Sequence, residues 1–187
     1  YSYETVESTW KEIHQFKGGR AIFTFPNTPI KCGGAPQKIM YLAEDYFRKM
    51  HFRKECEILF ASAGAQIFGV KKYAEKLNEI VQKRDIHTLF NHNLIAIDGE
   101  KREAHFKNVE TQEEKTLHYQ MIHVTPPMGA PAFIRNSPLS DKDGWVSVDK
   151  HSLQHTQFPN IFGLGDASSL PTSRTGAAVR KQAPVLV

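Results

Sequence analysis

Apolar side chains recur at helical spacing in three segments of the N-terminal half. The pattern predicts one helix over residues 3–16, which Gly18-Gly19 ends, a second from Pro36 to about Met50, and a third over residues 71–84. Pro36 suits a first helical turn, where its missing N–H costs nothing. The side chains expected to face inward are Val6, Trp10, Ile13, Phe16, Ile39, Met40, Leu42, Ala43, Phe47, Tyr73, Leu77, Ile80 and Val81.

Short apolar runs between these helices predict buried strands at residues 21–25 and 56–61. A strand, a helix and a second strand in this order form a βαβ unit, which implies a parallel sheet covered by helices. From residue 86 to 124 the pattern changes to short segments between charged turns, which predicts an antiparallel β meander. The expected meander strands are 93–97, 104–106, 116–119 and 121–124.

The C-terminal third is poorer in regular patterns. Residues 131–144 resemble a loop, residues 145–149 alternate like a half-exposed strand, and residues 158–166 predict a strand that ends in a Gly-Asp turn. A further helix is expected to begin near Thr175, and its pattern is still running at Val187. Because the chain also begins without Met, we expect it to be a piece of a longer protein.

Composition excludes several classes of protein. With 40% hydrophobic residues the chain can bury a core, and two cysteines in 187 residues cannot form a disulfide framework. A net charge of +4 is too small to indicate a nucleic-acid partner. No apolar run approaches the roughly 18–20 residues of a membrane span. His151 and His155 lack an acidic or cysteine partner that would complete a metal site, so no metal is expected.

The loop after the first predicted strand carries a cysteine where a dinucleotide-binding unit has its glycine fingerprint. Gly33-Gly34 alone does not rebuild G-x-G-x-x-G, which argues against nicotinamide binding there. Cys32 instead lies between Lys31 and the helix start at Pro36, and both a cation and unpaired helix amides favour the nucleophilic thiolate. The alternative, an unreactive cysteine in a tight turn, stays open. Cys56 opens a strand and is interpreted as a small apolar residue.

A second candidate site is the Gly-Asp turn at Gly165-Asp166 together with the helix that begins near Thr175. A carboxylate at the end of a strand can accept from a ligand hydroxyl, and helix N-terminal amides suit an anionic group. Gly-Asp is also an ordinary turn sequence, and the spacing to the helix favours the functional interpretation.

The run from Ala21 to Lys38, which includes Pro26-Asn27-Thr28-Pro29-Ile30-Lys31-Cys32-Gly33-Gly34-Ala35-Pro36, resembles mitochondrial-type sulfide:quinone oxidoreductases. Residues 67–73, 123–128 and 162–179 resemble the same family in the same order. The resemblance implies a FAD/NAD(P)-binding, Rossmann-like two-domain flavoprotein of α/β class. Residues 1–130 would form the second Rossmann-like domain, which carries the redox cysteine. Residues 131–187 would be a truncated return segment of the FAD-binding domain. The family's FAD fingerprint, partner cysteine and membrane-docking segment would lie outside this chain.

The same resemblance implies FAD-dependent oxidation of hydrogen sulfide at the mitochondrial inner membrane. Cys32 would hold the sulfane sulfur as a persulfide and, as a thiolate, attack or approach the flavin C4a atom. Lys38 would stabilise anionic sulfur or reduced flavin. Electrons would pass to ubiquinone, and the sulfur would leave to glutathione or sulfite. This fragment alone is expected to be inactive.

For the cofactor, the resemblance implies Asp166 and Gly165 at the ribityl hydroxyls and the amides of Thr175, Gly176 and Ala177 at the flavin N1–O2 edge. Thr125 and Pro126 would line the flavin. The role of Arg174, where some relatives carry Lys, stays open. The alternatives are another two-domain flavoprotein, such as a type II NADH:quinone oxidoreductase, and a fragment without catalytic activity.

Overall fold

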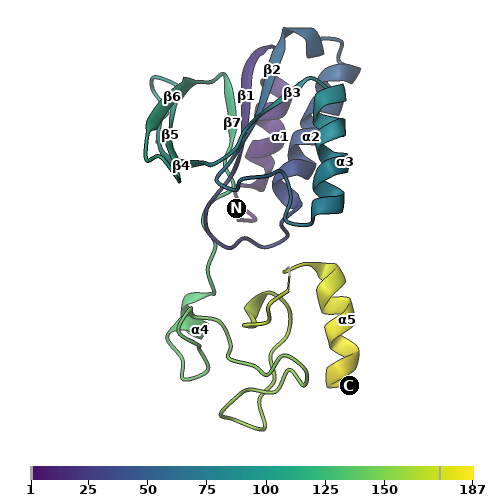
Figure 1. Cartoon of the computed structure of the whole chain (residues 1–187), viewed down its shortest axis with the longest axis vertical. Coiled ribbons are helices and arrows are strands. Elements are labelled where there is room, and N and C mark those ends of the chain that lie inside the picture. Colours follow the sequence, from purple (N-terminus) through teal and green to yellow (C-terminus); the bar gives the residue numbers. More distant parts are fainter. Residues whose placement is uncertain (1, 173) are drawn as a thin grey trace. The chain divides into compact units, whose positions relative to one another are not determined.

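The computed structural model describes residues 2–172 and 174–187. It divides the chain into two compact units, one formed by Tyr1–Asn27 and Gly34–Pro126, the other by Thr28–Gly33 and Pro127–Val187. Figure 1 shows that regular helices and strands are concentrated in the first unit, and that the second consists mostly of loops.

The first unit is built on a four-stranded parallel sheet with the order β3-β2-β1-β7. Its strands are β1 (Gly19–Phe25), β2 (Cys56–Ser62), β3 (Ile86–Leu89) and β7 (Met121–His123). Three helices cover one face, α1 (Val6–Gln15), α2 (Ala35–Lys49) and α3 (Lys71–Lys83), as Figure 1 shows. The expected βαβ unit is therefore confirmed, because β1 and β2 pair in parallel from Gly19↔Cys56 to Phe25↔Ser62.

The opposite face of the parallel sheet packs on an antiparallel sheet of β4 (His92–Asp98), β5 (Glu103–Asn108) and β6 (Glu114–His118). Successive side chains of each strand point to opposite faces of the parallel sheet, so a separate hydrophobic core forms on each face. Phe23 and Phe60 point to the helices, whereas Ile22 and Leu59 pack against Ala104 and other residues of the second sheet.

The expected meander was wrong at both ends. Residues 86–89 form β3, which pairs in parallel with β2, and residues 121–123 form β7, which pairs in parallel with β1. A strand of three or four residues carries too little alternation to reveal which sheet it joins.

Several expected inward positions were also wrong. Leu42 is 66% exposed and Tyr73 is 58% exposed. Val6 and Trp10 are also more than half exposed, although the Trp10 ring packs against Tyr46 of α2. The buried face of α2 contains Met40, Ala43 and Phe47, all fully buried as expected, together with one unexpected carboxylate, Glu44. Residues adjacent to a buried face were assigned to it because a helical stripe has no sharp edge in sequence.

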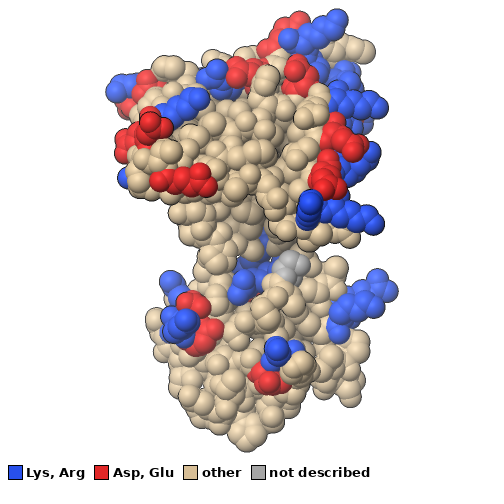
Figure 2. Space-filling view, viewed as in Figure 1, with Lys and Arg blue, Asp and Glu red and all other residues tan. Residues whose placement is uncertain are grey.

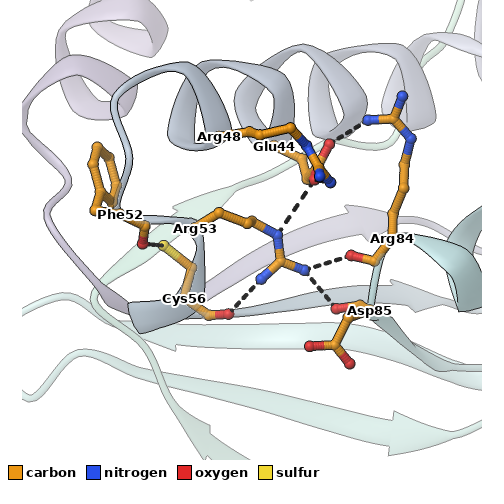
Figure 3. A network of polar contacts seen from close by, with 7 residues as sticks. All are labelled: Glu44, Arg48, Phe52, Arg53, Cys56, Arg84 and Asp85. Carbon is orange, nitrogen blue, oxygen red and sulfur yellow. Dashed lines mark hydrogen bonds and ion pairs between the residues drawn. The ribbon is translucent and has the colours of Figure 1, made fainter.

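Glu44 is a fully buried carboxylate that three arginines surround (Figure 3). Arg48 and Arg84 each donate to one of its two oxygens, and Arg53 Nε lies 3.4 Å from Oε1. These arginines come from α2, from the short 3-10 turn Arg53–Glu55, and from the residue after α3. Glu44 therefore links its own helix to the following 3-10 turn and to Arg84, which lies 40 residues later in the sequence.

Arg53 extends this network to the backbone. Its Nη1 donates to the carbonyl of Cys56 at 2.8 Å, and its Nη2 donates to the carbonyls of Arg84 and Asp85 at 2.7 and 2.6 Å. Asp85 adopts a left-handed conformation with φ 52° at the turn into β3. The guanidinium thus fixes the first residue of β2 relative to the start of β3.

The second unit contains little regular structure. Its elements are the short helix α4 (Ala132–Arg135), the 3-10 turn η2 (Gly165–Ala167) and helix α5 (Gly176–Leu186). The strands expected at 145–149 and 158–166 were wrong, because Val146, Val148 and Phe162 make only isolated bridges there. A small core holds these loops together, composed of Ala130, Ile134, Trp145, Val146, Val148, Leu153 and Leu170.

Charged residues do not gather by sign on the face of the first unit that Figure 2 presents, where acidic and basic side chains lie next to one another. Among the helices that residues 2–172 and 174–187 form, none combines the length and the apolar character that crossing a membrane requires.

Candidate functional site

The segment that carries Cys32 groups with the second unit. Thr28–Gly33 packs with Pro127–Val187, whereas Gly34 and α2 belong to the first unit. The sequence-based expectation assigned the cysteine to residues 1–130 as one domain. In the structure Cys32 therefore lies in the same unit as Asp166, Gly165, Thr175, Gly176 and Ala177.

Cys32 adopts a left-handed backbone conformation with φ 56°. This region is unfavourable for residues with a Cβ atom, so neighbouring contacts must hold the residue there. Its N–H donates to the carbonyl of Arg174 at 2.8 Å, and Lys31 forms a parallel bridge with Arg174. The cysteine loop is thereby attached to the residue that lies two positions before helix α5.

Lys31 links the cysteine loop to the Gly-Asp turn. Its Nζ lies 3.7 Å from Asp166 Oδ2, and its N–H donates to the sulfur of Met128 at 3.2 Å. The two charged side chains are 38% and 45% exposed, so the pair contributes little to stability. The sequence did not indicate this pair.

Gly165 has φ +66°, and a Cβ atom there would lie 2.9 Å from Val179 Cγ2 of α5. Its N–H donates to Gln182 Oε1 at 2.8 Å. Only glycine permits the turn to approach α5 this closely. Asp166 follows at once in the short 3-10 turn Gly165–Ala167.

Helix α5 begins as expected, with Thr175 at its N-cap, and Thr175 Oγ1 accepts from the N–H of Ala178 at 3.1 Å. Gly176 and Ala177 are exposed. A Cβ atom at Gly176 would meet nothing within 4 Å. The first amides of α5 are thus accessible to an anionic or electron-rich group. Ser173, which the sequence motif included, lies outside the described residues.

The other three predicted site residues belong to the first unit. Thr125 is 3% exposed, and its N–H donates to Thr24 Oγ1 at 3.0 Å, just beyond the end of β7. Pro126 follows and is half-buried, and Lys38 is exposed on the first turns of α2. Thr125 and Pro126 thus follow the carboxyl end of β7, the end of a parallel strand where α/β folds carry ligands.

Cys56 is a different thiol. It is 6% exposed at the start of β2, and its Sγ donates to the carbonyl of Phe52 at 3.1 Å. Burial raises its pKa to about 11. The sequence interpretation of Cys56 as a small apolar residue matches this burial.

Sequence reasoning missed the side-chain setting of Arg174. The guanidinium lies over the Trp145 ring, with Cζ 3.8 Å from the ring centre, and Nη2 donates to the carbonyl of Ser168 at 3.3 Å. The pair joins residues that are distant in sequence, so no local pattern indicates it.

Among residues 2–172 and 174–187 there is no group of three or more histidine, cysteine or acidic residues suited to hold a metal ion. His155 illustrates why a histidine is not by itself a ligand. It is 4% exposed, bonded through Nε2 to the carbonyl of Leu139 and through Nδ1 to the N–H groups of Gln157 and Phe158.

No protein-family model matches the chain. The chain is 53% identical over 187 residues to the mouse protein named "Sulfide:quinone oxidoreductase, mitochondrial", which corresponds to all of this chain and 42% of the mouse protein. The Dictyostelium discoideum protein of the same name is 50% identical, with 100% of this chain and 41% of that protein covered. The resemblance expected from the motifs is confirmed, and this chain spans about two fifths of the length of these relatives.

Solved structures confirm the fold class. The sulfide:quinone oxidoreductase from Aquifex aeolicus matches 88% of this chain and 39% of its own with a TM-score of 0.73 and 15% identity. NDH2 from Plasmodium falciparum in complex with NADH matches 87% of this chain and 34% of its own, with a TM-score of 0.62 and 16% identity. Since both proteins share this fold, the fold does not separate the two activities.

Proposed function

We propose that this chain is the catalytic mid-section of a mitochondrial sulfide:quinone oxidoreductase, with Cys32 as the thiol that handles sulfur. The main support is the attachment of Cys32, in a left-handed conformation, to Arg174, which lies two residues before α5. A strained backbone held by its surroundings is common at functional sites. Identity of 53% to a mitochondrial relative, over all of this chain and 42% of that protein, supports the same assignment.

The residues of the second unit fit FAD. The Asp166 carboxylate accepts hydrogen bonds and is partly exposed, and the amides of Gly176 and Ala177 are accessible at the start of α5. Hydroxyl groups of a ribityl chain suit the carboxylate, and the electron-rich N1–O2 edge of a flavin suits helix N-terminal amides. Gly165 is required here because it lets the Asp166 turn approach Val179. From the first unit, Thr125 and Pro126 would line the cofactor.

The protein's own task is to position sulfur and charge. FAD, when bound, supplies the two-electron acceptor. Cys32 would hold the sulfur as a persulfide. Joining one thiol and one hydrogen sulfide through an S–S bond releases two electrons and two protons, and bound FAD would accept the electrons. Lys38 would offer a cation to the anionic sulfur from the start of α2.

The overall reaction balances with a quinone as oxidant. One hydrogen sulfide and one small thiol, RSH, give the persulfide RSSH, while two electrons and two protons convert ubiquinone to ubiquinol. Glutathione would serve as RSH, and sulfite would give thiosulfate in its place. The relatives' names support a mitochondrial location, and we propose the inner membrane because the quinone resides in a membrane.

The test is anaerobic addition of sulfide to the flavin-loaded full-length protein and to its Cys32→Ala variant, followed through the absorbance of oxidised flavin near ~450 nm. Bleaching should be lost by several orders of magnitude in the variant, because no other described thiol has this setting. Cys56→Ala is the matched control and should bleach at nearly the parent rate. Equal loss in both variants would show that the thiols are misassigned.

A second candidate function, NADH:quinone oxidoreduction, is the alternative that the sequence left open, and the shared fold of the Plasmodium NDH2 structure is compatible with it. The loop between β1 and α2 opposes it, since Gly33-Gly34 lacks the glycine pattern of a nicotinamide site. Bleaching of the flavin by NADH, with no response to sulfide, would replace the first proposal by this one. For residues 1–187 alone we expect no stoichiometric flavin, which the same absorbance band tests.

A further inference from the structure

We propose that Arg174, held in place by Trp145, is a positioning residue that fixes the Cys32 thiol for its reaction. The inference rests on the proposed function, in which Cys32 is the sulfur-handling thiol. All of its parts lie within the second unit.

The backbone of Arg174 holds the cysteine loop directly. Cys32 N–H donates to the Arg174 carbonyl at 2.8 Å, and the neighbouring Lys31 makes the parallel bridge to the same residue. Because Cys32 has φ 56°, a loop without this attachment would relax toward negative φ. Such a change would redirect the Cα–Cβ bond and move the thiol.

The side chain of Arg174 explains why its backbone is a firm anchor. The guanidinium lies 3.8 Å from the centre of the Trp145 ring, and Trp145 is 7% exposed in the core of this unit. Nη2 donates to the carbonyl of Ser168, which is 1% exposed. Both contacts require a planar group that stacks and donates at its edge, which arginine has and lysine lacks.

The Nε atom of Arg174 is buried and has no hydrogen-bond partner among the described residues. A guanidinium that served only as a surface charge would turn this N–H toward water. Its burial indicates that stacking on Trp145 determines the side-chain position. Trp145 therefore holds Arg174, and Arg174 holds Cys32.

The test compares Arg174→Met, Arg174→Lys and Trp145→Leu in the flavin-loaded full-length protein that also carries Cys56→Ala. Arg180→Met is the matched control, because Arg180 is an exposed arginine of α5 outside this arrangement. Two rates are measured for each variant, namely flavin bleaching by sulfide and alkylation of Cys32 by iodoacetamide. Thermal unfolding is followed in parallel.

We expect opposite changes in the two rates. Bleaching by sulfide should fall by about 10- to 100-fold in Arg174→Met, because a thiol displaced by about 1 Å loses its reactive geometry. Alkylation should rise by roughly three- to tenfold, because a loosened loop exposes the half-buried thiol more often. Arg174→Lys should behave like Arg174→Met, and Trp145→Leu should shift both rates in the same directions. Arg180→Met should leave both rates unchanged.

Full recovery of the sulfide rate in Arg174→Lys would overturn the proposal, since a charge alone would then suffice. Unchanged rates in Arg174→Met, or a fall in both rates with an unfolding midpoint well below that of Arg180→Met, would also overturn it. If sulfide fails to bleach even the parent while Arg174→Met still accelerates alkylation, the proposed function falls and the positioning role stands.

Discussion

The two cysteines lie in regions that differ in almost every physical respect. Cys32 is half-buried, has a left-handed backbone and belongs to a unit of loops. Cys56 is buried at the start of a central strand, with its thiol bonded to a carbonyl and its pKa raised to about 11. The comparison teaches that backbone setting, more than residue type, decides whether a thiol is available for chemistry.

The regions around the two cysteines also differ in how many contacts hold them in place. Around Cys56, the buried Glu44 and its arginines hold α2, β2 and the end of α3 in one arrangement. Around Cys32, single contacts such as the Lys31–Asp166 pair and the Arg174 carbonyl hold the loop. A rigid sheet of this kind suits a scaffold. A strained loop held by few contacts is typical of a reactive site.

The largest expected effect is a loss of stability in the region around Cys56 when Glu44 is replaced. Glu44→Ala should lower the free energy of unfolding by about 3–5 kcal/mol, because it leaves the Arg53 guanidinium, whose side chain is only 13% exposed, without its carboxylate. Chemical denaturation monitored by circular dichroism measures the loss. The matched control is Asp45→Ala, since Asp45 pairs with Lys49 on the outer side of the same helix and should cost less than about 1 kcal/mol. Equal costs for both variants would contradict a structural role for the cluster.

The rate of alkylation tests whether the Cys56 thiol is as unreactive as its burial predicts. At pH 7.5 a pKa of about 11 leaves Cys56 with roughly 300-fold less thiolate than an ordinary thiol of pKa about 8.5. A thiolate of higher pKa is also a stronger nucleophile, which raises the reaction rate by about tenfold. In the Cys32→Ala variant, Cys56 should therefore react with iodoacetamide at least ~20-fold more slowly than free cysteine. Mass spectrometry of the alkylated peptide measures the rate. A Cys56 that reacts as fast as cysteine would remove the contrast.

Helical periodicity predicted the existence of α1, α2 and α3, and it correctly placed Ile13, Met40, Ala43, Phe47 and Val81 on their buried faces. It misplaced Leu42 and Tyr73, since the edge of a stripe depends on neighbouring helices. The strand β7 was assigned to the wrong sheet because its partner, β1, lies a hundred residues earlier at Ala21↔Met121. The three residues of β7 contain no sequence pattern that indicates such a distant partner strand.

The region around Cys32 was predictable only in its residue types. Cys32, Asp166 and the start of α5 were recognised from motifs, whereas their attachments were not. Lys31 to Asp166 and Arg174 to Trp145 are contacts between loops, and loops have no period from which such a pairing can be inferred. Likewise, the isolated bridge Val146↔Ser168 replaces an expected strand.

Alkaline pH provides a smaller test of the buried thiol. The folded-state pKa of Cys56 is raised from 9.0 to about 11 by burial, so the folded state favours the protonated thiol. Its contribution to stability is fully present below pH 9 and is lost as the pH rises toward 11. Relative to Cys56→Ala, the parent chain should lose about 1–2 kcal/mol over this interval, after allowance for solvent screening. Parallel stability curves for the two proteins would contradict this burial effect.

The smallest expected effect concerns the strain at Cys32. Cys32→Gly and Cys32→Ala both remove the thiol, but only glycine accepts φ 56° without steric cost. Cys32→Gly should therefore be more stable than Cys32→Ala by about 0.5–1 kcal/mol, even though glycine gains more entropy on unfolding. At Cys56, whose backbone is extended, the order should reverse, with Cys56→Gly less stable than Cys56→Ala. Equilibrium unfolding of the four variants measures both differences. If glycine were also the weaker residue at position 32, the loop would carry no backbone strain, and the left-handed cysteine would cease to distinguish the two regions.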